Sequence, residues 1–206
     1  AVFTSVGLWR WNSDLETGNF VPIGHPAPEH LAEERIQATP NNLCQFSYAL
    51  DTEKDKGLWV AQKAFEELVS KEKDFNIHKK DRRVWQSGAE GNDNIFILTS
   101  QVFCKRTPYT RVREAGIQYE LHDWIAQATA KPKEYFANPD RPAFFEPRDG
   151  KLRPMKECQP PYPKLGDLMW FSFVVEIFIG TKNWITKFVP LEFVRVGRVS
   201  TDLLGE

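Results

Sequence analysis

Residues 167–198 constrain the fold more than any other part of the chain. Two long runs of apolar and β-branched residues flank a short GTKN segment at positions 180–183. Because successive side chains of a strand point to opposite faces, the first run would present an apolar core face: Met169, Phe171, Phe173, Val175 and Ile177. The pattern predicts a long antiparallel hairpin whose turn places Glu176 opposite Lys187.

Helical signals and shorter strands surround this hairpin. The clearest helix spans residues 51–75, with Asp51 or Thr52 as its cap and apolar residues at helical spacing: Leu58, Ala61, Phe65, Leu68 and Val69. Shorter helices are expected at 28–38 and 122–130, and a buried strand at 94–104. We therefore expect an α+β protein with an antiparallel β-sheet, open or barrel-like, two or three helices and a single domain over residues 1–206.

Composition excludes several classes of protein. The formal net charge of −1 argues against coating nucleic acid by bulk charge, although a local basic patch remains open. The cysteines form no CxxC pair and the histidines have no metal-ligand spacing, so we expect no metal and no cofactor. P-loop, GxGxxG, GxSxG and HExxH motifs are absent.

The same residues bear on location. Separated cysteines are typical of reduced thiols in an intracellular protein, and no apolar run is long enough to span a membrane. The opening AVFTSVGLWRW has neither the basic nor the apolar segment of a signal peptide. The expectation is a cytoplasmic monomer without membrane association.

Residues 104–124, CKRTPYTRVREAGIQYELHDW, combine cations with aromatic side chains. A two-residue turn at Ala115-Gly116 would make this stretch a hairpin. Alternation would then gather one set of side chains on a common face: Tyr109, Arg111, Arg113, Gln118, Glu120 and His122. Since guanidinium groups bind phosphate and aromatic rings stack on bases, this face is a candidate nucleobase or phosphate site.

Two alternatives stay open for this stretch. A type I turn with a glycine bulge would shift the register by one residue and separate the set. The face could also be an ordinary solvated one, whose cross-strand ion pairs contribute about 0.2–1 kcal/mol each.

A second basic run, HKKDRRVW at 78–85, is either a solvated helix end or loop, or a footprint for RNA or DNA phosphates. Glu176 lies among aromatic residues of the closing hairpin. It would form a cross-strand salt bridge with Lys187, or act as a catalytic carboxylate if its surroundings raised its pKa.

Four segments carry a resemblance to a known family: LWRWNSDLETGNFVPIG, NLCQFSYALDTEKDKGLW, FCKRTPYTRVREAGIQYELHDW and GDLMWFSFVVEIFIGTKNWITKFVPLEFVRVG. With these segments, the chain resembles a group of intracellular proteins of basidiomycete mushrooms, the edodin-like ribosome-inactivating proteins. The resemblance implies a toxin that is an rRNA N-glycosylase, acting without a metal on an adenine in the sarcin–ricin loop of large-subunit rRNA. Its partner would be the ribosome, and translation would be inhibited.

This activity needs particular residue types. A carboxylate must stabilise the oxocarbenium-like sugar, a guanidinium must neutralise the departing adenine, and aromatic rings must clamp the flipped base. The expected catalytic residues are Tyr109, Arg111, Arg113, Tyr119 and Glu120, with Glu176 as the alternative carboxylate. The expected substrate-binding residues are Trp85, Lys105, Arg106, His122 and Trp124.

The chain departs from plant toxins of this activity. Their helical EAAR signature is missing, and the nearest string, REAG at 113–116, lacks its Glu–Arg spacing. Plant-toxin positions are therefore not carried over. The rival hypotheses are a non-catalytic, OB-like protein that binds single-stranded nucleic acid, and a structural or interaction protein whose basic runs are solvated.

Overall fold

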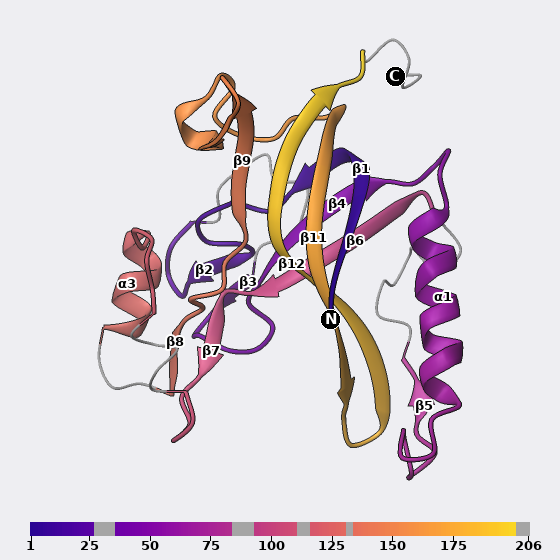
Figure 1. Cartoon of the computed structure of the whole chain (residues 1–206). Helices are drawn as coiled ribbons and strands as arrows, with labels where there is room; N and C mark the ends of the chain where they lie inside the picture. The colour runs from indigo at the N-terminus through magenta and orange to yellow at the C-terminus, as the bar shows by residue number, and fades with distance from the viewer. Residues whose placement is uncertain (27–35, 84–92, 111–115, 131–133, 201–206) are drawn as a thin grey trace. The chain divides into compact units, whose positions relative to one another are not determined.

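A computed structural model describes residues 1–26, 36–83, 93–110, 116–130 and 134–200 (Figure 1). Eight of its described strands form one large sheet, in the order β10-β9-β12-β11-β1-β4-β6, with β5 pairing in parallel with β12. Their bounds are β10 (Lys151–Pro154), β9 (Ala143–Arg148), β12 (Asn183–Arg198), β11 (Asp167–Ile179), β1 (Val2–Asn12), β4 (Gln45–Asp51), β6 (Ile95–Gln101) and β5 (Asp81–Arg82).

Two small sheets and two helices complete the described elements. β2 (Phe20–Pro22) pairs in parallel with β3 (Ile36–Ala38), and β7 (Phe103–Lys105) pairs antiparallel with β8 (Tyr135–Ala137). The helices are α1 (Gly57–Ser70) and α3 (Asp123–Thr129), with a short 3₁₀ turn, η1, at Met155–Glu157. The α+β class and its largely antiparallel sheet are confirmed.

The chain divides into two compact units. The first unit comprises Ala1–Arg10, Ala49–Leu98 and Phe144–Glu206, and the second comprises Trp11–Tyr48 and Thr99–Ala143. Whether the chain is a single domain stays a prediction.

The predicted closing hairpin, β11 and β12, forms the longest strand pair of the first unit. β11 and β12 run side by side along their length (Figure 1), and Gly180 N–H donates to the Asn183 carbonyl at 2.9 Å to close the turn. Glu176 lies opposite Lys187, as predicted. A register shift follows Ser172, where β12 carries Pro190. Proline cannot donate a ladder hydrogen bond, so a strand tolerates it at such a bulge.

Aromatic packing on one face of this hairpin forms the core of the first unit. Phe193 of β12 is fully buried. The Phe144 ring stacks on it at 5.0 Å between centroids, and the Trp9 ring meets it edge-on at 5.1 Å. Aromatic pairs at such distances add about 0.5–1.5 kcal/mol beyond their buried area. This packing joins β1, β9 and β12.

Helix α1 exists where it was predicted, but its start and its buried face differ. It begins at Gly57, and neither Asp51 nor Thr52 caps it. Its one buried side chain among the described helix residues is Gln62, at 3% exposure, whereas Leu68 is exposed. The reason is Trp59, which packs edge-on against Phe96 at 5.1 Å and donates from Nε1 to Thr52 Oγ1 at 3.1 Å. This contact turns the predicted apolar stripe partly toward solvent.

Other predicted helices have mixed outcomes. Residues 27–35 lie outside the described residues, and Ile36–Ala38, expected at the end of that helix, form strand β3 instead. The helix predicted over 122–130 is confirmed as α3, whose N-cap is His122. No described helix is long and apolar enough to cross a lipid bilayer.

A tight turn organises the start of the second unit. Asp14 Oδ1 accepts hydrogen bonds from the backbone N–H groups of Glu16 and Thr17 at 2.9 and 2.7 Å. Gly18 follows with a φ of +61°. A Cβ at Gly18 would lie 2.4 Å from the Gln45 carbonyl oxygen, so only glycine fits there without displacing the backbone.

Candidate nucleic-acid interface

The hairpin predicted over 104–124 is wrong for the described residues. β7 ends at Lys105 and pairs with β8, with Phe103 opposite Ala137. A turn then follows, in which Thr110 N–H donates to the Thr107 carbonyl at 3.1 Å and Thr107 N–H donates to Thr110 Oγ1 at 2.8 Å. Pro108 favours this break because a proline disfavours helix before it and lacks an N–H. Residues 116–122 form no strand.

The expected catalytic residues consequently do not share a face of a hairpin. Tyr109 is 92% exposed in the turn, and Glu120 is exposed in coil. Tyr119 is half-buried, donates from its hydroxyl to the Asn138 carbonyl, and has the Arg141 guanidinium 4.2 Å from its ring centroid. Burial raises the pKa of Tyr119, against the opposing effect of Arg141. Arg111 and Arg113 lie outside the described residues, as does the residue that would decide the turn, Ala115.

The expected substrate-binding residues have internal partners. Lys105 Nζ pairs with Glu134 at 2.7 Å, and Arg106 Nη1 donates to the Tyr135 carbonyl at 2.7 Å. His122 Nδ1 accepts from Trp124 N–H at 3.2 Å, which caps α3. The Trp124 ring also meets the rings of His122 and His25 edge-on. These contacts support a structural role for this set; Trp85 lies outside the described residues.

Glu176 is exposed on β11, and its charge raises the pKa of Lys187. Burial, the larger influence, lowers the pKa of Lys187 overall. Glu176 therefore acts on the Lys187 ammonium group across the ladder, and a catalytic role for Glu176 stays a prediction.

The basic run at 78–85 is also partly structural. Lys80 Nζ donates to the Gly180 carbonyl, and Arg82 Nε pairs with Glu66 at 2.6 Å. Arg83 N–H extends the β5–β12 pairing by donating to the Trp184 carbonyl at 2.8 Å. Lys80, Arg82 and Arg83 therefore help to hold β5 in place, and His78 and Lys79 are exposed.

A stronger basic surface lies at the sheet edge of the first unit. β9 and β10 form a hairpin around Asp149-Gly150, whose φ angles of 52° and 72° fit a tight turn of the I′ type. The register places Arg148 opposite Lys151 and Glu146 opposite Arg153. Alternation therefore puts these four side chains on one face, where the three cations are exposed.

The segment that follows β10 adds to this surface. Tyr162 is 51% exposed, with Lys164 Nζ 5.5 Å from its ring centroid. We call the whole group the basic edge surface, and its exposed members are Arg148, Lys151, Arg153, Lys156, Tyr162, Lys164 and Arg198.

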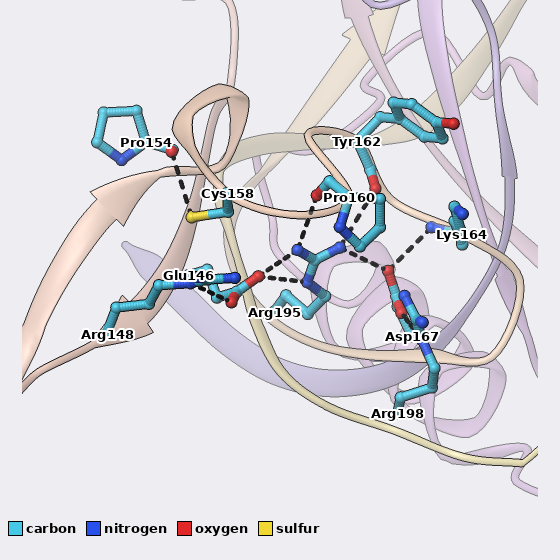
Figure 2. Close-up of polar contacts among 10 residues, drawn as sticks. All are labelled: Glu146, Arg148, Pro154, Cys158, Pro160, Tyr162, Lys164, Asp167, Arg195 and Arg198. Carbon is cyan, nitrogen blue, oxygen red and sulfur yellow. Dashed lines mark hydrogen bonds and ion pairs between the residues drawn. The ribbon is translucent and has the colours of Figure 1, made fainter.

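A buried charge network fixes this segment to the sheet (Figure 2). The Arg195 guanidinium lies between two carboxylates: its Nε donates to Glu146 at 2.7 Å and its Nη1 to Asp167 at 3.3 Å. It also donates to the carbonyls of Pro160 at 2.9 Å and Tyr162 at 3.3 Å. Buried charges are tolerated only with such partners.

The network also affects the net charge that the basic edge surface exposes to solvent. Burial raises the pKa of Glu146, but hydrogen bonds from Arg195 and Arg148 outweigh it and hold that pKa below the ordinary 4.5. Asp167 is fully buried and accepts from Arg195 and from Arg198 Nε, the latter at 2.7 Å. These two carboxylates share the guanidinium groups of Arg195, Arg148 and Arg198, so the remaining exposed cations face solvent opposed mainly by Asp149 and Glu157.

A pocket of about 360 Å³ lies beside this network. Its walls include Glu146, Arg195 and Arg198, together with Gln159 and Pro160 of the covering segment. It brings a carboxylate and guanidinium groups to one accessible place.

The basic edge surface was not predicted from the sequence. A signal was present. The string RDGKLR has Asp-Gly at its centre, which is typical of a two-residue hairpin, and its cations alternate around that turn. The Arg195 network had no local signal, since its partners come from distant parts of the chain.

Among the described residues, no group of three or more His, Cys, Asp or Glu side chains is placed to hold a metal ion.

No protein-family model matches the chain, and no curated protein matches it. Among solved structures, one similar chain is gp2.5, a single-stranded DNA-binding protein encoded by bacteriophage T7. The match covers 97% of this chain and 93% of that chain, with 9% sequence identity and a TM-score of 0.37. Similarity at this level does not establish a shared fold, and no family assignment follows from it.

Proposed function

We propose that the protein binds single-stranded nucleic acid through the basic edge surface. The main support for this proposal is the charge arrangement. Exposed cations gather on one face of the β9–β10 hairpin and on the segment after it, while the nearby carboxylates Glu146 and Asp167 are already paired with Arg195, Arg148 and Arg198. Phosphates are attracted to such a local excess even when the net charge of the chain is −1.

Each part of the surface has a role in this proposal. Lys151 and Arg153 project from the edge hairpin and contact backbone phosphates. Tyr162 offers an exposed ring on which an unpaired base stacks for about 1–3 kcal/mol. Lys164, beside that ring, pairs with the phosphate of the stacked nucleotide. A base within a duplex is already stacked, so Tyr162 favours single strands.

The experiment measures the fluorescence anisotropy of a labelled pyrimidine-rich oligonucleotide, with its duplex as the comparison. We expect tighter binding of the single strand, and a loss of about tenfold or more in Lys151→Glu/Arg153→Glu. Tyr162→Ala should weaken the single strand and leave the duplex unchanged.

The matched control reverses two exposed charges on α1 and just after it, Lys63→Glu/Lys71→Glu, and changes the net charge equally. Equal losses in both double variants would mean that bulk charge, not this surface, is responsible. No binding of any oligonucleotide by the folded wild-type protein would overturn the proposal.

A second candidate, rRNA N-glycosylase activity, is favoured by the pocket beside Arg195. Its volume of about 360 Å³ accommodates a nucleobase, and its walls supply a carboxylate and guanidinium groups. In this proposal water adds to C1′ of the adenosine, the C1′–N9 bond breaks, and adenine leaves with a proton. Glu146 would stabilise the cationic sugar, and Arg198 would neutralise the adenine.

This candidate is tested on ribosomes, by aniline cleavage of the rRNA and by release of free adenine. A discrete aniline fragment supports it, and its absence at high protein concentration contradicts it. Three variants then separate the carboxylates: Glu146→Gln, Glu120→Gln and Glu176→Gln. A loss of about 100-fold or more in the first alone, with its fold intact, would place the chemistry at this pocket.

A further inference from the structure

The first unit contains an apolar groove that neither proposed function uses. It lies between β1 and the start of α1 and has a volume of about 560 Å³. Its lining includes Phe3, Val6, Leu58, Leu168 and Phe173. Pockets of about 300–1,000 Å³ with mostly apolar walls are typical of sites for small organic ligands.

Aromatic packing keeps the floor of this groove in place. The Phe3 ring stacks on Phe173 at 5.7 Å with an interplanar angle of 26°, and meets Phe65 of α1 edge-on at 6.3 Å. Phe3 and Val6 nevertheless remain exposed. Because Phe173 is held by the core hairpin, the groove does not depend on a ligand to form.

The mouth of the groove is acidic. Asp51, Glu53 and Asp55 line it, with Lys54 as the one cation among its lining residues. Lys56 does not line the groove, and its Nζ contacts Asp93 at 2.9 Å and Asn94 at 2.7 Å. The backbone N–H of Gly57, which would favour an anion, already donates to Asp55 Oδ1 at 2.8 Å.

From this combination we propose that the groove binds a small amphiphilic cation, with its apolar body against Phe3 of β1 and Leu58 of α1 and its ammonium group at Glu53 and Asp55. A small molecule suits the volume of about 560 Å³. Asp51 is already paired with Arg10 at 2.9 Å, but Glu53 and Asp55 still exceed the one lining ammonium group, that of Lys54, so a cation suits the charge of the groove. It is independent of nucleic-acid binding.

The test uses three fluorescent probes with one apolar body: neutral diphenylhexatriene, its trimethylammonium derivative and its propionate derivative. The cationic probe should bind at least about tenfold more tightly than the anionic one, a ratio set by a single favourable charge contact. Equal binding of the three probes would overturn the charge assignment, and no binding of the cationic probe would overturn the site.

Variants locate the binding. Ala61→Trp fills the groove from α1 and should abolish binding, whereas Ala64→Trp adds the same ring at an exposed position outside the lining. Glu53→Gln/Asp55→Asn should remove the preference for the cation, and Glu67→Gln should keep it. Loss of binding in Ala64→Trp, or its persistence in Ala61→Trp, would contradict the placement.

Discussion

Arg195 of β12 holds Glu146 of β9 across 49 residues of sequence, with Nε 2.7 Å from Oε2. The side chains are only 7% and 17% exposed, so both charges are largely removed from water. In such a pair each partner is stable mainly because the other is present. The edge hairpin and the segment after it therefore depend on this guanidinium.

Replacing Arg195 with methionine should lower the free energy of unfolding by about 3–5 kcal/mol, because Glu146 and Asp167 lose their shared partner and the Pro160 carbonyl loses a donor. Urea denaturation measures the change. Lys151→Met, at an exposed position on the same edge hairpin, is the control and should change stability by less than about 0.5 kcal/mol. Similar effects of the two substitutions would show that the network is not structural.

The Glu146 carboxylate should make stability depend on acidity. Its pKa in the folded protein is held below the ordinary 4.5, with Arg195 and Arg148 facing it, so the unfolded chain binds the proton more readily. Its contribution is present above that ordinary pKa and is lost as the pH falls through the folded value. Thermal unfolding between pH 6 and 3 should show a shallower decline in Glu146→Gln; parallel curves would contradict this.

The closing hairpin could be predicted because two local signals agreed: the side chains alternate over long runs, and GTKN provides the turn. The register at Glu176 and Lys187 followed from these signals. The stretch at 104–124 has alternating side chains, but its Ala115-Gly116 sequence does not specify one turn type. Among its described residues a turn lies at 107–110. β7 pairs with β8, a pairing for which the local sequence gives no signal.

The functional residues were harder to predict for a physical reason. A sequence does not show which exposed cations form ion pairs within the protein and which can bind a ligand. Only the structure, which gives their partners, separates the two kinds. Arg82 and Lys105 are paired with Glu66 and Glu134, whereas Lys151 and Arg153 project from an edge hairpin. The buried face of α1 was similarly decided by the contact of Trp59 with a distant strand.

Lys187 should be a destabilising residue at neutral pH. Burial lowers its pKa, so the folded state disfavours the ammonium form that both states carry at pH 7. Lys187→Met should therefore raise the midpoint of urea denaturation at pH 7. The wild type should also gain stability as the pH rises toward 10.5, because the folded protein releases the proton first, and this gain should vanish in the variant. A lower midpoint in Lys187→Met would mean that attraction to Glu176 dominates.

Gly18 should tolerate no side chain. Gly18→Ala places a Cβ 2.4 Å from the Gln45 carbonyl oxygen and forces a φ of +61° on alanine, so we expect a loss of about 2 kcal/mol or more. Gly24→Ala is the control, since Gly24 also has a positive φ, +87°, but open space around it. The control should lose only about 1 kcal/mol. Equal losses would show that the close contact does not matter.

The salt dependence of oligonucleotide binding tests the central claim most directly. If the basic edge surface neutralises about four phosphates of a single strand, the logarithm of the association constant should fall with the logarithm of salt concentration with a slope of about −3. Lys151→Ala/Arg153→Ala should reduce the magnitude of that slope by about 1.4, since each lost contact contributes about 0.7. An unchanged slope in this variant, with the protein folded, would contradict the assignment of nucleic-acid binding to the β9–β10 edge.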